Sequence, residues 1–377
     1  MAINRHTLAT DRLDVLLGFS TGDILWYDAV HHKYNRLNKT HALHNKAVTQ
    51  VAWVPGSECL FVASFSDGVV LVLDKDREDR EMEPTAGKET TPSKEKSLDA
   101  SLVVDELVEQ RAAEGFEVFK PRKAHKHNPV SCWRIGQFVY GTGRSVSDVA
   151  FSPDGMHVAL ASLGGSLRVV HFAEERIMDT YKSFYGGLLC VTWSPDGKLI
   201  VTGGQDDLIS VYSLKERRLI ARCRGHTSWV SQIAFDVWRC DSRNYRFGSV
   251  GQDGKLLFWD FPVKGHSRMG KIPASTMRSA SFTDTMRARA MSGGSVAGPT
   301  AAQPGKPEHL VHPALAACES LIMEPIMSET ISALPLWSLV FTPDAALVAE
   351  KRGRVLVWER PKVTAYSGHS FAGQAQA

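Results

Sequence analysis

Four residues in the second half of the chain have side chains that could do chemistry. His226, Ser249 and Asp253 offer an imidazole, a hydroxyl and a carboxylate, which are the groups of acid–base catalysis, and Trp259 adds an indole N–H. The motifs that usually accompany catalysis are missing: the sequence contains no Gly-x-Ser-x-Gly, no phosphate loop ending in Gly-Lys-Ser/Thr, no His-Glu-x-x-His and no Cys-x-x-Cys. A structural role for these four residues is therefore the better hypothesis, and we expect no enzyme, cofactor or metal site.

The elements that must position these residues form a repeat. Asp253-Gly254 is a turn pair that leads through a short apolar run into Trp259-Asp260, and five other segments align with it without gaps. Their turn pairs are Thr21-Gly22, Asp67-Gly68, Gly164-Gly165, Asp206-Asp207 and Arg352-Gly353. A hydrophobic residue fills the position of Trp259 in every copy. The pattern indicates about six copies of one unit.

A second motif precedes most copies and completes the unit. It reads as a strand that ends in a turn of Pro-Asp-Gly type, as in 149–155 and 191–197, where proline sets φ and glycine accepts a positive φ. Three turn-to-turn spacings are 46, 42 and 47 residues, near the roughly 40–45 residues of a four-stranded propeller blade, and the other two, 97 and 99, fit one blade plus an insertion. A closed ring of such blades removes exposed sheet edges. We expect an all-β propeller with about six readable blades.

This unit resembles the WD-repeat family. In that family, side chains in the positions of His226, Ser249, Asp253 and Trp259 form a buried hydrogen-bonded relay that fixes the blade, and such a set is stabilising only when every member is satisfied. Asp67 and Asp206 occupy the same turn position in other copies. The resemblance therefore implies a structural role for His226, Ser249, Asp253, Trp259, Asp206 and Asp67.

Composition limits the classes of function. Lys and Arg number 44 against 41 Asp and Glu, a formal net charge of +3, which argues against a nucleic-acid protein. No apolar run reaches the length of about 20 residues that spans a bilayer, and no secretory signal opens the chain. The widely spaced cysteines indicate buried free thiols, and we expect an intracellular protein of the cytoplasm, the nucleus or both. They are Cys59, Cys132, Cys190, Cys223, Cys240 and Cys318.

Two long insertions interrupt the repeat. We expect propeller sequence in 1–74, 128–262 and 331–361, largely disordered insertions at 75–127 and 263–330, and a tail at 362–377. Within the first insertion, 102–113 has the spacing of a short amphipathic helix, which would pack on a blade or bind a partner. The basic run 120–127 could be a solvated loop, a nuclear import signal or a phosphate contact. In the second insertion, 278–281 could accept phosphate.

The ring raises a question of closure. The first readable copy supplies a second and third strand at 14–28 with no clear first strand before them, so we expect an incomplete seven-blade ring. Either the chain is a truncated product or gene model, or Ile3 to Thr10 provides a makeshift closing strand. We expect a lower stability than that of a complete propeller, because an unpaired edge would remain at the seam.

Several stretches carry a narrower resemblance, to the fungal catabolite-repression protein CreC and its animal relatives, which are WD-repeat activators of ubiquitin-specific proteases. The match covers most blade segments, is strongest over 128–262 and is poor in the insertions. The stretches that carry it are 18–24, 128–133, 184–198, 200–208, 220–222, 225–231 and 245–253.

This resemblance implies a non-catalytic scaffold that binds and stabilises or activates a CreB-like deubiquitinase, as a monomer within a hetero-complex. It implies a role in carbon catabolite repression and transcription regulation. Two other functions stay open: the substrate receptor of a ubiquitin ligase, and a nucleic-acid or chromatin scaffold using the basic run 120–127. We expect neither a membrane nor a nucleic acid as partner.

A binding face can be predicted from the loops between blades. Phe184 and Tyr185 stand where the repeat usually has Gly-His, and Trp229 closely follows His226. Aromatic side chains on rigid loops are typical interface anchors. The predicted partner-binding face consists of Phe184, Tyr185 and Trp229 with Gln205 and Gln252 from the adjacent turns, although Trp229 could instead pack between blades.

Overall fold

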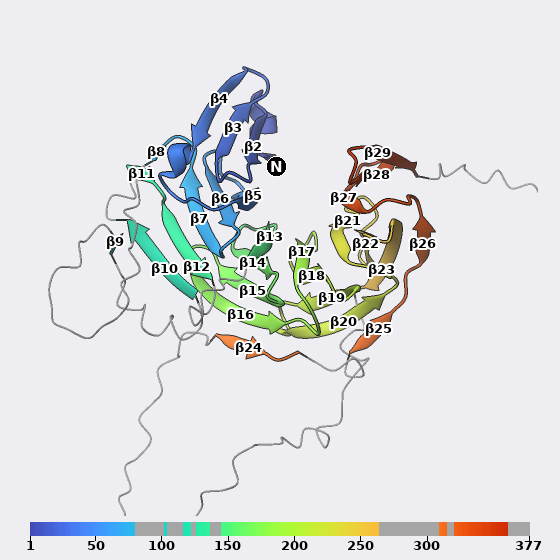
Figure 1. Cartoon of the computed structure of the whole chain (residues 1–377). Helices are drawn as coiled ribbons and strands as arrows, with labels where there is room; N and C mark the ends of the chain where they lie inside the picture. The colour runs from blue at the N-terminus through green and yellow to red at the C-terminus, as the bar shows by residue number, and fades with distance from the viewer. Residues whose placement is uncertain are drawn as a thin grey trace, which may run out of the picture.

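Six antiparallel sheets follow one another around an arc. The computed structural model describes residues 1–79, 102–103, 116–121, 126–135, 145–263, 309–314 and 320–360. Figure 1 shows the first sheet in blue and the last in red at the two ends of the arc. The predicted all-β propeller with about six blades is confirmed. We number the sheets blade 1 to blade 6 along the chain.

The first three blades begin near the N-terminus. Blade 1 contains β1 (Ala2–Ile3), β2 (Asp14–Gly18), β3 (Ile24–Asp28) and β4 (Lys33–Leu37), with short 3-10 turns η1 (Thr7–Thr10) and η2 (Lys39–His41). Blade 2 contains β5 (Val48–Trp53), β6 (Leu60–Phe65), β7 (Val69–Asp74), β12 (Ser131–Ile135), β10 (Phe116–Pro121) and β9 (Leu102–Val103), in that spatial order. Blade 3 contains β13 (Val146–Phe151), β14 (His157–Ser162), β15 (Ser166–His171) and β16 (Arg176–Lys182).

The remaining blades complete the arc. Blade 4 contains β17 (Leu188–Trp193), β18 (Leu199–Gly204), β19 (Leu208–Ser213) and β20 (Arg218–Arg224). Blade 5 contains β21 (Val230–Phe235), β22 (Asn244–Gly251), β23 (Lys255–Pro262) and β26 (Met327–Thr330). Blade 6 contains β27 (Leu336–Phe341), β28 (Ala345–Glu350) and β29 (Val355–Glu359). A separate parallel pair joins β8 (Glu78–Asp79) to β11 (His127–Asn128).

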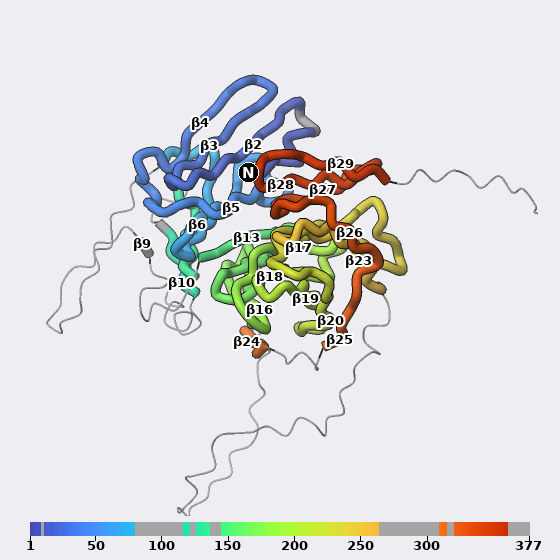
Figure 2. The backbone as a smooth tube through the Cα atoms, turned by 45° about the vertical axis from the view of Figure 1, so that its right-hand side comes forward, coloured from blue at the N-terminus to red at the C-terminus, as the bar shows by residue number. Residues whose placement is uncertain are grey.

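A rim segment, consisting of the described residues 309–314 and 320–330, runs along the outer edges of three blades. It contributes β24 (Leu310–His312) parallel to β16, β25 (Leu321–Met323) parallel to β20, and β26 antiparallel to β23. Figure 2 shows β24 and β25 beside the outer strands of blades 3 and 4. The chain therefore leaves blade 5, returns at blade 3, and passes blades 4 and 5 before it enters blade 6.

The insertions differ in part from the sequence expectation. Residues 310–312, 321–323 and 327–330, expected to be free of strands, form the three rim strands, because short half-exposed segments can add to a sheet edge without a hydrophobic pattern of their own. Leu102 and Val103, expected to begin a helix, instead pair with β10. Most of the predicted insertions, residues 80–101, 104–115 and 264–308, together with 278–281 and the tail 362–377, lies outside the described residues.

The turns form as the proline motif predicts. In the turn after β17, the Ser194 hydroxyl donates a hydrogen bond to the Asp196 carboxylate at 2.7 Å and accepts one from the Leu199 amide at 2.9 Å. Gly197 completes this turn at a φ of 71°, a conformation that costs other residues free energy. Each such turn brings a blade's two innermost strands into register.

The core lies between the blades rather than at one centre. Apolar side chains from facing sheets form buried layers, such as that between blades 4 and 5, which contains Val201, Val211, Phe247 and Trp259. Equivalent layers join each blade to the next along the chain. This stacking fixes the direction of every loop at the ends of the sheets.

Candidate partner-binding face

The relay residues of blade 5 lie together in one hydrogen-bonded chain. The indole Nε1 of Trp259 donates to the Ser249 hydroxyl at 2.9 Å, and Ser249 Oγ lies 2.8 Å from His226 Nε2. His226 Nδ1 lies 3.0 Å from the Asp253 carboxylate. Ser249 and Trp259 are fully buried and His226 is 6% exposed. This arrangement leaves no open space for a substrate at the histidine, which favours a structural role.

The turn aspartates differ according to whether a histidine faces them. Burial raises the pKa of Asp253, but the hydrogen bond from His226 and that from the Thr227 amide outweigh burial and leave the pKa below its usual value. Asp67 shows the same balance, since His44 Nε2 lies 2.9 Å from its carboxylate. The pKa of Asp206 is instead raised by burial, because its carboxylate accepts mainly from backbone amides such as that of Leu208.

Phe184 and Tyr185 stand in the loop where a histidine opposite Asp206 would be expected, and this loop is held by hydrogen bonds. Gly186 has a φ of 65°, and the Ser183 hydroxyl donates to its carbonyl at 2.8 Å. The side chain of Gln205 accepts from the Gly187 amide at 2.9 Å, which ties the loop to the turn of blade 4. Within this frame Tyr185 is 74% exposed and Phe184 is 48% exposed.

The second aromatic loop is fixed by the turn of blade 5. The Gln252 amide donates to the Trp229 carbonyl at 2.9 Å, and the Thr227 amide donates to Asp253 at 2.9 Å. The Trp229 side chain is 42% exposed, so it is not buried between the blades. The relay thus supports the backbone that presents this tryptophan.

An arginine behind the first loop was not foreseen from the sequence. The Arg222 guanidinium lies 5.0 Å from the centre of the Phe184 ring, while the residue is 4% exposed. A guanidinium over an aromatic face contributes about 0.5–2 kcal/mol. Its sequence signal would have been a charged residue within the otherwise apolar run 219–223, which is buried throughout. Arg222 orients Phe184, so the three exposed aromatics stand on loops of restricted conformation.

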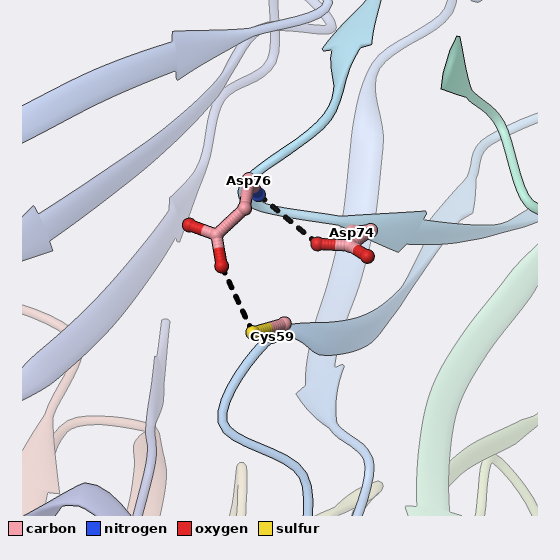
Figure 3. Close-up of side chains that lie close together, drawn as sticks. All are labelled: Cys59, Asp74 and Asp76. Carbon is pink, nitrogen blue, oxygen red and sulfur yellow. Dashed lines mark hydrogen bonds between the residues drawn. The ribbon is translucent and has the colours of Figure 1, made fainter. Parts of the chain in front are cut away.

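Other polar clusters were tested for site chemistry. Cys59, Asp74 and Asp76 lie close together, as Figure 3 shows. The Cys59 thiol donates a hydrogen bond to the Asp76 carboxylate, with a donor–acceptor distance of 2.9 Å. Asp74 is bound by Arg77 and Asp76 by Lys75. Burial and Asp76 raise the pKa of the Cys59 thiol to about 11. A cysteine binds a metal ion as the thiolate, and a raised pKa keeps Cys59 in the thiol form. This cluster is therefore poorly suited to hold a cation.

Two further features, a lysine of the basic run and a cavity between two blades, are poorly suited to bind a polar ligand. Lys120, at the start of the basic run, pairs with Glu175 at 2.7 Å and is not free for a phosphate. A cavity of about 600 Å³ lies between blades 5 and 6, with Phe258, Phe341 and Trp358 among its walls. Two of the arginines that line it are paired: Arg360 binds Asp236 at 2.6 Å, and Arg246 binds Asp260 at 2.6 Å. The cavity suits an apolar side chain rather than a polar substrate.

Comparison with known proteins agrees with the repeat. The family model described as "WD domain, G-beta repeat" matches residues 132–171 and 178–213. The chain contains WD repeats. It is also 35% identical over 372 residues to the UBP9-binding protein bun62 of Schizosaccharomyces pombe. That alignment covers 95% of this chain and 64% of the relative, so the chain spans less than two-thirds of the relative's length.

These likenesses bear on the narrower resemblance. The relative is a protein whose name links it to a ubiquitin-specific protease, which confirms the resemblance of this chain to WD-repeat proteins of that kind. Carbon catabolite repression and transcription do not enter that name. In the part of the chain that the structure describes, no helix is long and apolar enough to cross a membrane.

Proposed function

We propose that this WD-repeat protein is a non-catalytic partner of a ubiquitin-specific protease. The observation that carries the proposal is its 35% identity to a UBP9-binding protein along nearly its whole length. The resemblance to CreC supports a finer proposal, in which the complex contains a CreB-like protease and one copy of this chain. In that form it would stabilise or activate the protease in carbon catabolite repression and transcription regulation, in the cytoplasm, the nucleus or both.

The proposed contact surface is the partner-binding face of blades 3 to 5. Phe184, Tyr185 and Trp229 are large, exposed and carried on loops that hydrogen bonds hold in place. Ordered aromatic anchors lose little conformational entropy on binding, which is why they dominate interface energies. Gln205 and Gln252 flank them and add polar groups at the rim of the contact.

The first prediction tests this face directly. The triple change Phe184→Ala, Tyr185→Ala and Trp229→Ala should weaken binding to a purified UBP9-type protease by about a hundredfold or more, because each anchor contributes on the order of a tenfold effect. Biolayer interferometry with the immobilised protease gives the affinity, and cleavage of a fluorogenic ubiquitin substrate reports activation.

A matched control separates loss of the face from loss of the fold. Met156, Val237 and Trp238 are 50%, 54% and 57% exposed, and they lie at the opposite ends of the strands. Their triple alanine variant should bind like the wild type. Equal binding by the variant of the partner-binding face, with an unchanged circular dichroism spectrum, would remove this face from the proposal.

A further inference from the structure

The rim segment lies beside the strand that connects the two aromatic loops. The first loop, residues 183–187, leads from β16 into blade 4 and carries Phe184. The second loop, residues 225–229, leads from β20 into blade 5 and carries Trp229. β25 pairs in parallel with β20, as Figure 2 shows at the outer side of blade 4. The rim segment is therefore close enough to both loops to influence how they are held.

β25 is attached by apolar side chains, and the residue before it contacts an arginine. Leu321 and Met323 pack against the buried layer between blades 4 and 5. Ser320, directly before β25, contacts Arg222 instead. The Arg222 guanidinium donates a hydrogen bond from Nη1 to the Ser320 hydroxyl, with a donor–acceptor distance of 3.4 Å.

Arg222 connects this contact to the first aromatic loop. The same guanidinium lies 5.0 Å from the centre of the Phe184 ring, and the residue is 4% exposed. The attraction between a cation and an aromatic ring is stronger when water is excluded. β25 pairs with residues 221–223 and so covers the outer edge of the strand that carries Arg222. Loss of β25 would hydrate the guanidinium and loosen its hold on Phe184.

A separate contact connects the rim segment to the second aromatic loop. Gly225 begins this loop, directly before His226. A Cβ atom added at Gly225 would lie 3.2 Å from Cγ of Pro325, so the proline packs closely against the backbone of the loop. The amide of Ile326 donates to the Phe258 carbonyl at 2.9 Å and keeps this part of the rim segment on blade 5. The rim segment thus supports both aromatic loops from behind.

We propose that residues 320–326 of the rim segment position the anchors of the partner-binding face, so that their attachment sets the affinity for the partner. The inference rests on the proposed function, because it concerns the same face. With β25 in place, the loops of Phe184 and Trp229 are restricted before the partner arrives, and little conformational entropy is lost on binding. When β25 detaches, the same anchors are present but binding must order them. Arg222 is buried and acts as a positioning residue.

The test releases β25 in the purified full chain. Leu321→Ser combined with Met323→Ser removes the apolar attachment. Hydrogen exchange measured by mass spectrometry should then rise in 320–323 and also in 183–187 and 225–229, while exchange in β17 and β18 stays unchanged. Affinity for a UBP9-type protease, measured by biolayer interferometry, should fall by about tenfold. Val311→Ser, the same kind of change at a rim side chain that is 59% exposed, should alter neither quantity.

A double-mutant cycle measures the coupling between β25 and Phe184. In a Phe184→Ala background, release of β25 should weaken binding by a smaller factor than in the wild type, because one of the anchors that it positions is absent. An equal factor in both backgrounds would overturn the proposal, as would a released β25 that leaves exchange in both loops unchanged.

Variants of Arg222 decide the question if the double serine variant unfolds blade 4. Arg222→Met should raise exchange in 183–187 while β25 stays paired, and Arg222→Lys, which retains a cation, should raise it less. Unchanged exchange in Arg222→Met would overturn the proposal. The exchange measurement needs no protease, so a wild-type chain that fails to bind the protease would count against the proposed function alone.

Discussion

At the scale of single residues, one protonation pattern satisfies the whole relay of blade 5. Trp259 donates to Ser249, Ser249 donates to His226 Nε2, and a proton on His226 Nδ1 is donated to Asp253. No member of this chain lacks a partner, which is the condition for a buried polar network to stabilise. The four relay residues could be predicted from their spacing because blade 5 keeps the whole Gly-His … Asp … Trp motif. The same reasoning missed His44, which lies opposite Asp67, because Leu43 stands in place of the motif's glycine.

The lowered pKa of Asp253 gives a prediction about pH. A carboxylate whose pKa is lower in the folded state contributes stability above its unfolded pKa, and this stability is lost as the pH falls through the folded pKa. Asp253→Asn should lower the free energy of unfolding by about 1–3 kcal/mol at neutral pH. The difference from wild type should shrink below about pH 4, the range of an unperturbed aspartate.

Urea unfolding at several pH values measures this difference. Asp207→Asn, in the turn of blade 4, is the matched control and should show little effect at any pH. A deficit of Asp253→Asn that persists undiminished in acid would show that the carboxylate's charge is not what stabilises blade 5.

At the scale of elements, the rim segment depends on a buried carboxylate. Asp179 of β16 is fully buried and is contacted by Arg217 at 3.0 Å and by His312 of β24 at 2.7 Å. The His312 ring also stacks on Tyr181, with ring centres 4.4 Å apart. Sequence patterns could not predict this attachment, because β24 has three residues and its strand pairing is specified by side chains distant in the chain.

Replacing His312 should release β24 without unfolding blade 3. In His312→Ala, Asp179 keeps its pair with Arg217, so the loss should stay local. Hydrogen exchange measured by mass spectrometry should rise in 310–312 and in the outer edge of β16, while exchange in β14 stays unchanged. Val311→Ala, at a side chain that is 59% exposed, is the control. Unchanged exchange in His312→Ala would mean that backbone pairing alone holds the rim segment.

At the scale of the whole molecule, the blades were predictable because each carries its own turn and strand signals. The position of the last blade relative to the first was not predictable from the sequence, because it depends on how all six sheets stack. Ala2–Ile3 does pair with β2, yet this adds an inner strand to blade 1 rather than a bridge to blade 6. The expectation of a low stability remains a prediction.

The open end gives that expectation a measurable form. Within the described residues, the extensive contacts of blade 6 are with blade 5, so blade 6 should open before blades that are covered on both sides. Amides of β27–β29 should lose protection from exchange at lower urea concentrations than those of β17–β20. Val348→Ala should widen this difference by weakening blade 6 alone, whereas Val201→Ala should narrow it. Loss of protection in all blades at one urea concentration would show instead that the ring unfolds as a single unit.

The course of the rim segment also sets an order in time. During synthesis the segment follows β23, so blades 3 and 4 and the first three strands of blade 5 have already left the ribosome when it appears. The rim segment can then pair with the outer strands of these blades, which are already available, and blade 6 is synthesised only afterwards. The rim segment would thus complete blade 5 and pair with the outer strands of blades 3 and 4 before the last sheet is synthesised.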